Sequence, residues 1–358
     1  MDGWRDRRIL DLLGIEAPIL LAPMAGPGTP ELAIAVSEAG GLGALPCALL
    51  SVAQARAAVE RIRAGTTRPF NLNFFCHAPP AADPARERAW RARLAPYQAE
   101  LGLHPAAAAP AATRAPFDED FCALVEECRP SVVSFHFGLP EPGLLERVRA
   151  SGAKVIASAT TVREAVWLAE RGCDAVIAQG LEAGGHRGAF LDEDITRQVG
   201  TMALVPQVAD AVSVPVIAAG GIADGRGVAA ALMLGAAAAQ IGTAYLLTPE
   251  AATSPMHRRA LAGATADGTA LTNLFTGRPA RGLVNRLMRE QGPISDAAPP
   301  FPLAGNALAP LRAAAEAKGR DDFTPMWAGQ GAPLARDLPA SALTRRLAAE
   351  ALARLEGH

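Results

Sequence analysis

Residues 214–242, VPVIAAGGIADGRGVAAALMLGAAAAQIG, contain one complete alternation of predicted strand and helix. An apolar run at 214–219 ends in a pair of glycines, a helical pattern follows at 225–235, and a second apolar run covers 238–242. Strand-sized apolar runs separated by helical patterns are typical of βαβ units, in which both strands lie parallel in one sheet. This stretch therefore predicts an α/β fold.

The same alternation recurs upstream. Short apolar runs predict strands at 19–22, 42–46, 70–75, 131–135, 154–159 and 175–179, before those at 214–219 and 238–242. The intervening patterns predict helices at 29–39, 52–63, 118–128, 142–151, 162–171, 200–211 and 225–235. An open doubly wound sheet commonly has five or six strands, whereas eight parallel strands close into a barrel. We therefore predict a (β/α)8 TIM barrel.

Two segments depart from this rhythm. Residues 76–117 are rich in Pro, Ala and Arg, and we interpret them as an insertion after the third strand, with a helix at 84–101 and a low-complexity loop at 104–116. Residues from about 250 to 358 follow the last strand and include helical patterns near 308–318 and 341–355. We expect this extension to complete the final barrel helix and to add a helical cap over the mouth, within a single domain covering 1–358.

Composition narrows the class of protein. Hydrophobic residues make up 50% of the 358 residues and charged residues 20%, so a large core can be buried. The net charge of −2 predicts no attraction to nucleic acid or to an anionic membrane. Five scattered cysteines without a CxxC pair favour reduced thiols over disulfides or a metal site. With no apparent signal peptide or membrane span, we expect a cytoplasmic protein; its oligomeric state stays open.

The loop QGLEAGGHRG, residues 179–188, follows the sixth predicted strand. Catalytic groups of such barrels lie on the loops after the strands. Gln179 offers both a donor and an acceptor to a heterocycle, and Gly184 and Gly185 let the backbone approach a ligand closely. Histidine titrates near neutral pH and suits proton abstraction, so we predict His186 as a catalytic base. A structural or solvated histidine is the alternative.

The seventh and eighth predicted strands also end in glycine loops. Gly220 and Gly221 follow one strand, and Gly242 and Thr243 follow the other, just after Gln240 and Ile241. Glycine loops at these two places form the usual phosphate site of a barrel, with backbone N–H groups directed at the anion. Ordinary turn glycines are the alternative. The absence of GxGxxG after the first strand argues against a Rossmann dinucleotide site.

Two further strand ends are candidates for ligand contact. Ala22, Pro23 and Met24 form a stiff turn of mostly small residues that a flat ligand can approach, although an ordinary turn explains it equally well. Asn71 and Asn73 share one side of the third strand, which we take as the barrel interior. Their partner is either a ligand or a polar side chain of a neighbouring strand, and Asn73 lies closer to the mouth.

Other polar residues carry weaker signals. His136 follows the fourth strand and can face the mouth, while Tyr245, just past the eighth strand, either touches substrate or packs. The histidines show no spacing typical of a metal site, so no metal is predicted.

Taken together, these motifs resemble those of the bacterial nitronate monooxygenases, formerly called 2-nitropropane dioxygenases. The similar segments are LGIEAPILLAPMAG, RPFNLNFF, VSFHFG, QGLEAGGHRG, AAGGI, QIGTAYL, TGRPARG and WAGQG, spread from about residue 10 to 335. The resemblance implies an FMN-dependent barrel that oxidises alkyl nitronates, such as propionate 3-nitronate, with dioxygen to a carbonyl compound and nitrite. It also implies that His186 takes the α-proton from neutral nitroalkanes, and that FMN contacts Met24, Asn73, Gln179, Gly184, Gly221 and residues 240–243.

Two alternatives stay open at this point. FMN-dependent enoyl-[acyl-carrier-protein] reductases share the EAGGH segment, and NAD(P)H:quinone reductases have a similar fold, so a nicotinamide site is compatible with the sequence. The HRG ending and the TGRPARG and WAGQG segments favour the nitronate branch. A flavin-binding barrel without turnover is the second alternative, but such a protein needs no base at His186.

Overall fold

The computed structural model describes residues 3–81, 83–103 and 114–357, and shows an α/β TIM barrel. The strands are parallel in the order β1-β9-β8-β6-β5-β4-β3-β2, and a bridge between Leu20 and Leu42 joins the two ends of the sheet. Closure leaves the strands without a free edge. Their bounds are β1 (Ile19–Leu21), β2 (Gly43–Pro46), β3 (Phe70–Phe75), β4 (Val132–His136), β5 (Lys154–Ala159), β6 (Ala175–Gln179), β8 (Val216–Ala219) and β9 (Ala238–Ile241).

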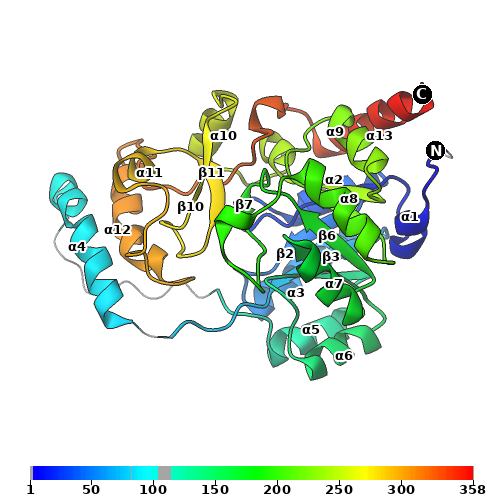
Figure 1. Cartoon of the computed structure of the whole chain (residues 1–358), viewed down its shortest axis with the longest axis horizontal. Helices are drawn as coiled ribbons and strands as arrows, with labels where there is room; N and C mark the ends of the chain where they lie inside the picture. Colours follow the sequence, from blue (N-terminus) through cyan, green and yellow to red (C-terminus); the bar gives the residue numbers. More distant parts are fainter. Residues whose placement is uncertain (1–2, 82, 104–113, 358) are drawn as a thin grey trace.

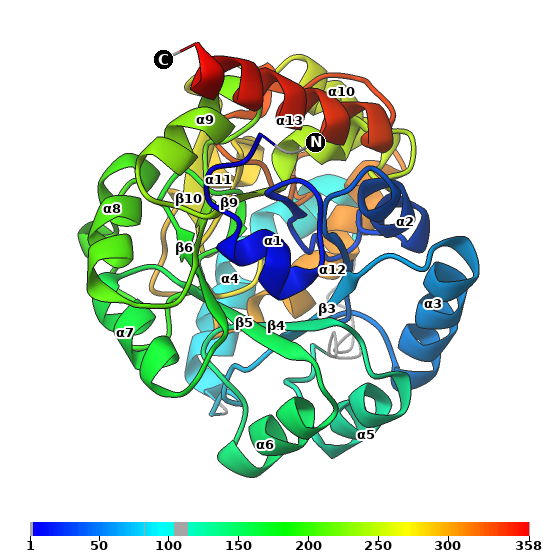
Figure 2. The same cartoon turned by 90° about the vertical axis from the view of Figure 1, so that its right-hand side faces the viewer.

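A ring of helices surrounds the strands (Figure 2). Its members are α2 (Pro30–Glu38), α3 (Val52–Gly65), α5 (Glu119–Cys128), α6 (Pro142–Ala150), α7 (Val162–Glu170), α8 (Thr201–Ala211), α9 (Gly225–Met233) and α13 (Ala340–Glu356). The short helix α1 (Arg8–Leu13) lies across the end of the barrel opposite the mouth, and its Ile9, Leu10 and Leu13 are buried in the core there.

Side-chain caps explain where several helices begin. Thr29 accepts a hydrogen bond from the Leu32 amide, with Pro30 at the first helical position, as the sequence predicted. Ser51 and Gln54 form a reciprocal capping box at the start of α3. Asp118 likewise accepts from the Phe121 amide at the start of α5. Each cap satisfies backbone N–H groups that have no acceptor within the helix.

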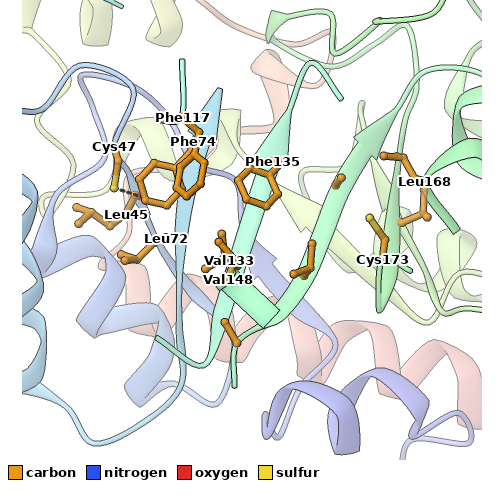
Figure 3. Packing of buried hydrophobic residues seen from close by; sticks show 14 of the residues in the cluster. Leu45, Cys47, Leu72, Phe74, Phe117, Val133, Phe135, Val148, Leu168 and Cys173 are labelled. Carbon is orange, nitrogen blue, oxygen red and sulfur yellow. Dashed lines mark hydrogen bonds between the residues drawn. The ribbon is translucent and has the colours of Figure 1, made fainter. Parts of the chain in front are cut away.

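The larger hydrophobic core lies between the strands and the outer helices. Phe74 of β3 packs edge-on against Phe117, with ring centroids 4.9 Å apart, and against Phe121 of α5 at 5.2 Å. Figure 3 shows this outward-facing row continuing through Phe135 and Val133 of β4. Full burial of one such side chain contributes about 1.5–3 kcal/mol. Because alternate residues of a strand face opposite sides, the asparagines of β3 point into the barrel.

A cap covers the mouth of the barrel. Its sheet consists of β10 (Thr269–Thr272), β11 (Ala280–Leu283) and the two-residue β7 (Gly185–His186), all antiparallel. The insertion helix α4 (Pro84–Leu101) lies beside α12 (Ala304–Glu316) at the far end of the molecule from the termini (Figure 1). Trp90 of α4 is fully buried there and donates a hydrogen bond to the Ala304 carbonyl. The remaining elements are α10 (Pro255–Ala262), α11 (Arg286–Gln291) and the 3₁₀ turns Ile195–Arg197, Thr243–Leu247 and Ala332–Leu334.

The eight predicted strands and the insertion helix are confirmed, while the extension differs from expectation. The cap is a sheet with helices rather than a purely helical layer, and the helix expected near 308–318 is α12, which begins earlier. The helix expected near 341–355 is α13, which completes the barrel ring. The elements α1, β7, β10, β11, α10 and α11 were not predicted. Most of the expected low-complexity loop, residues 104–113, lies outside the described residues.

All five cysteines are unpaired. Within the described ranges, none of the helices has the length and apolar character needed to cross a membrane. The same residues contain no group of three or more His, Cys, Asp or Glu side chains placed to hold a metal ion.

Candidate active site

A cavity of about 480 Å³ opens at the carboxyl ends of the barrel strands. The loops after β1, β3, β6, β8 and β9 form its wall, and residues of the cap close it from the other side. This volume is typical of sites for small molecules and cofactors. The sequence-predicted residues that line the cavity are Ala22, Pro23, Met24, Asn73, Gln179, Gly184, Gly185, His186, Gly220, Gly221, Gln240, Gly242 and Thr243.

Ile241 is the exception among the predicted cofactor contacts. Its side chain is buried in the core, and its carbonyl accepts a hydrogen bond from the Ala22 amide at 2.9 Å. Successive residues of a strand face opposite sides, so Gln240 and Gly242 reach the cavity while Ile241 faces away. The predicted contact of Ile241 with the cofactor finds no support in this geometry.

Antiparallel pairing fixes the backbone of His186, which lies opposite Ala280 of β11. The His186 carbonyl accepts a hydrogen bond from the Gln179 side-chain amide at 3.0 Å and lies 3.2 Å from Nε2 of His136. A carbonyl oxygen only accepts, so Nε2 of His136 carries the proton in this contact. His136 thus faces the mouth, one of the positions that the sequence left open. Its hydrogen bond holds the backbone of His186.

Aromatic rings surround the His186 imidazole. The centroids of Phe301 and Trp327 lie 5.3 and 5.5 Å from it, and Nε2 is 3.0 Å from the Thr276 hydroxyl oxygen. Burial, followed by the positive charge of Arg114, holds the pKa of His186 well below the usual histidine value of 6.5. The imidazole is therefore neutral at physiological pH and available as a proton acceptor.

The polar side chains in the barrel interior bond to one another. Asn71 and Asn73 both donate to the hydroxyl oxygen of Ser134 on β4, each at 2.8 Å. The neighbouring strand thus supplies the partner that the sequence left open, although Asn73 also lines the cavity. Gln179 accepts from the Gly188 amide at 2.8 Å in addition to its bond with His186, so its side chain shapes the loop as well as the cavity wall.

The glycine loops after β8 and β9 have the features of an anion site. Gly220 and Gly221 have φ of 126° and 71°, a region that favours glycine. A Cβ on Gly220 would lie 2.7 Å from the Thr201 hydroxyl oxygen. Among the described residues, the N–H groups of Gly221 and Gly242 find no backbone or side-chain acceptor. Unpartnered N–H groups beside a cavity fit a phosphate, so this end suits the tail of a flavin nucleotide.

Close backbone contact joins the β6–β7 loop to the WAGQG segment. A Cβ on Gly184 would lie 2.5 Å from the Gly329 nitrogen, so only glycine fits there. The Gly329 amide in turn donates to the Thr243 hydroxyl at 2.9 Å. Three segments far apart in the sequence, at 184, 243 and 329, therefore meet beside the cavity.

A buried arginine next to His186 holds the same loop from within. Arg187 is 1% exposed, and its guanidinium donates to the carbonyls of Gly180 at 2.6 Å and Gln179 at 2.7 Å and to the side-chain oxygen of Gln198. No carboxylate of the described residues pairs with it. The arginine thus serves as a multivalent donor that closes the turn after β6.

We expect Arg187→Met to lower the free energy of unfolding by about 3 kcal/mol, because the substitution leaves buried carbonyl oxygens without a donor. Chemical denaturation measures this change. Arg226→Met is the matched control: its guanidinium is 64% exposed and pairs with Asp224, so a change within about 0.5 kcal/mol is expected. Equal effects of the two substitutions would contradict the structural role of Arg187.

Comparison with known proteins identifies the family of this chain. The family model described as nitronate monooxygenase matches residues 6–350. The chain belongs to this family. It is 47% identical to a nitronate monooxygenase of Pseudomonas aeruginosa over 96% of this chain and 98% of the relative, and 44% identical to one of Paraburkholderia phytofirmans over 96% and 94%. Membership in the nitronate monooxygenase family makes the chain a flavin-dependent oxidoreductase.

Solved structures agree with this family. The chain resembles the nitroalkane oxidase of Streptomyces ansochromogenes with a TM-score of 0.89 and 40% identity over 98% of this chain and 99% of that one. FabK of Thermotoga maritima is more distant, with a TM-score of 0.74 and 30% identity over 99% and 98%. The nitronate monooxygenase assignment is therefore better supported than the reductase alternative.

Several residues in or beside the cavity were not found from the sequence. Thr276 and Trp327 lie in the TGRPARG and WAGQG segments, which the sequence marked only by resemblance. Arg114, Phe301 and Arg312 come from segments without strand ends, so barrel geometry gave no signal for them. Tyr245, by contrast, packs: it is fully buried, and its hydroxyl lies 2.7 Å from that of Thr344.

Proposed function

We propose that this chain oxidises alkyl nitronates with dioxygen to a carbonyl compound and nitrite, using FMN as its flavin. The observation that carries this proposal is a neutral imidazole, His186, in a cavity that also offers unpartnered N–H groups on the loops after β8 and β9. The first group suits proton abstraction and the second suits a phosphate tail. The family and the nitroalkane oxidase structure support the same reaction class.

His186 acts on neutral nitroalkanes in this scheme. The Thr276 hydroxyl lies 3.4 Å from the Arg278 carbonyl, to which it can only donate, so it accepts the proton on Nε2 of His186. That tautomer leaves Nδ1 as the basic nitrogen. The proton beside a nitro group is acidic because the resulting charge is delocalised onto oxygen. Removal of this proton generates the nitronate, whereas a nitronate supplied directly needs no base.

The remaining residues bind and orient. The glycine loops after β8 and β9 would hold the FMN phosphate, and residues 22–24, Asn73, Gln179 and Gly184 would line the flavin ring. When bound, the flavin accepts electrons from the nitronate, which is the redox chemistry of the cofactor itself. The aromatic wall of Phe75, Phe301 and Trp327 excludes water from the space next to His186.

We expect a nitronate to reduce the bound flavin under anaerobic conditions, while NADH leaves it oxidised. Stopped-flow absorbance of the flavin band measures both reactions with the same protein. Rapid bleaching by NADH would instead assign the chain to the reductase alternative. Purified protein that is colourless and does not take up flavin would overturn the proposal altogether, including its flavin-binding part.

A further inference from the structure

Two side chains of the barrel hold the carbonyl group of His186. Nε2 of Gln179, at the end of β6, lies 3.0 Å from the carbonyl oxygen, and Nε2 of His136, at the end of β4, lies 3.2 Å from it. A carbonyl oxygen has two lone pairs, so these two donors use its full capacity. Because β7 has only two residues, the barrel as well as β11 determines where the His186 backbone lies.

The contact from His136 depends on which ring nitrogen carries the proton. Burial, followed by the positive charge of Arg278, lowers the pKa of His136 to about 3, so the ring is neutral at physiological pH. A neutral imidazole has one N–H group and one nitrogen lone pair. With the proton on Nε2 the ring donates to the His186 carbonyl, whereas with the proton on Nδ1 two lone pairs would face each other across 3.2 Å. One tautomer thus holds β7, and the other repels it.

Ser158 of β5 contacts the other nitrogen of this ring. Its hydroxyl oxygen lies 2.5 Å from Nδ1 of His136, and the residue is 4% exposed. The hydroxyl hydrogen rotates, so Ser158 donates to Nδ1 when the proton of the ring is on Nε2. The Phe135 carbonyl is 3.5 Å from the same hydroxyl, which is longer than a usual O–H···O bond. A chain of hydrogen bonds therefore runs from β5 through the His136 ring to β7.

Close packing confines the ring within this chain. A Cβ on Gly188 would lie 2.8 Å from Cε1 of His136 and 2.9 Å from the Ser158 hydroxyl oxygen, so the backbone of Gly188 lies directly against the pair. The Phe137 ring packs against the same imidazole, with centroids 4.5 Å apart. Since both nitrogens are also hydrogen-bonded, Nε2 of His136 has a fixed position relative to the barrel.

We propose that Ser158 is a positioning residue for proton abstraction: through the His136 ring it fixes the backbone of His186 and so directs the imidazole at the α-carbon of a neutral nitroalkane. This inference rests on the proposed function and assigns two further residues to the support of its base. Ser158 is not among the described residues that line the cavity, so it does not touch the substrate. Precise placement matters because a displacement of about 1 Å costs as much as about 100-fold in rate.

The selectivity between a neutral nitroalkane and its nitronate tests the inference. The selectivity ratio is kcat/KM for nitroethane divided by kcat/KM for ethyl nitronate, and only the neutral compound needs the base. We expect His136→Phe, which removes the donor, to lower this ratio by about 10- to 100-fold. Ser158→Ala, which removes one neutral hydrogen bond, should lower it by about 5- to 10-fold. Ser151→Ala is the matched control: the Ser151 hydroxyl donates to the Val148 carbonyl at 2.6 Å, at the end of α6, and the ratio should not change.

A double-mutant cycle shows whether Ser158 acts through His136. In the His136→Phe background, Ser158→Ala should change the selectivity ratio by less than about twofold, because the chain of hydrogen bonds is already interrupted. If the two losses multiply instead, Ser158 acts independently of the ring and the inference is overturned. Equal losses of kcat/KM for nitroethane and ethyl nitronate in Ser158→Ala contradict it as well, because a general disturbance of the site affects both compounds.

Nitrogen-15 NMR of the imidazole groups gives a readout that does not depend on activity. The His136 signals are those that disappear in His136→Phe. In the unmodified holoenzyme at neutral pH, we expect Nδ1 of His136 to be unprotonated and Nε2 to be protonated. A protonated Nδ1 would overturn the inference alone, since Ser158 would then accept rather than donate. A holoenzyme that oxidises neither nitroethane nor ethyl nitronate would overturn the proposed function, and the positioning role with it.

Discussion

We expect His186→Asn to lower kcat/KM for neutral nitroalkanes by about 10²- to 10⁴-fold, the usual contribution of a positioned general base. Asparagine preserves the approximate size of the side chain but cannot accept the α-proton. Among the described lining residues, the His186 imidazole alone combines a basic nitrogen with a position beside both Phe301 and Trp327. Steady-state kinetics with nitroethane, prepared free of its anion, measures the loss.

Three controls distinguish loss of the base from loss of the site. With a preformed nitronate the same variant should stay within about tenfold of the unmodified enzyme, because no proton has to be removed. Its flavin content should be unchanged. A His186→Asn enzyme that oxidises neutral nitroalkanes at the original rate would refute the role of the histidine.

The same experiment gives a pH profile. An ordinary histidine loses half of its basic form at pH 6.5, but the lowered pKa of His186 keeps the imidazole neutral at that pH. The basic form is present above the folded-state pKa and is lost only as the pH falls through it. We therefore expect kcat/KM for the neutral nitroalkane to show no fall between pH 8 and 6 that follows a group with pKa 6.5.

Gly184→Ala is expected to weaken flavin binding by about tenfold or more and to lower the free energy of unfolding by about 2–3 kcal/mol, as overpacking of a tight interior does. The added Cβ would lie 2.5 Å from the Gly329 nitrogen and 2.6 Å from the Ala328 carbonyl carbon. These are backbone atoms held by further bonds, including that from Gly329 to Thr243, so they cannot move aside independently. Flavin fluorescence titration and urea denaturation measure the two effects.

Gly143→Ala is the matched control for this substitution. Gly143 lies near the start of α6, and a Cβ there meets no atom within 4 Å. The same change of residue should leave flavin affinity unaltered and stability equal or slightly higher, because alanine favours helix. Similar losses in both variants would show that the contact between Gly184 and the WAGQG segment is unimportant.

The barrel could be predicted because its strands are buried on both faces, which makes each a short apolar run such as 154–159 or 175–179. The cap could not, because β7 has two residues and pairs with β11 almost a hundred positions later. Neither strand has enough alternating residues to be recognised locally. The sequence predicted α13 as a helix. Its position in the barrel ring could not be predicted, because the cap lies between it and the last strand in the sequence, and tertiary packing determines where it returns.

The candidate site shows the same division. His186 and the glycines were predicted because the residues that follow the strands of a barrel line its mouth, where active sites lie. The same geometry predicted that Gln179 lies at the mouth, but it did not predict its hydrogen bonds. The side-chain amide donates to the His186 carbonyl and accepts from the Gly188 amide, both in the loop backbone. Arg114 lies in the insertion, where residue type and spacing carry no fixed geometry, so its place beside Phe301 emerges only from the fold.

The strand β7, which contains His186, pairs with residues of β11 that are synthesised almost a hundred residues later. Ala280 and Arg281 must be synthesised before β7 can form, and α13 must follow before the ring of helices is complete. A nascent chain that has just produced the QGLEAGGHRG loop therefore has His186 without the strand pairing that fixes its backbone. We therefore expect chains that end before β11 to lack the cap strand that fixes the backbone of His186.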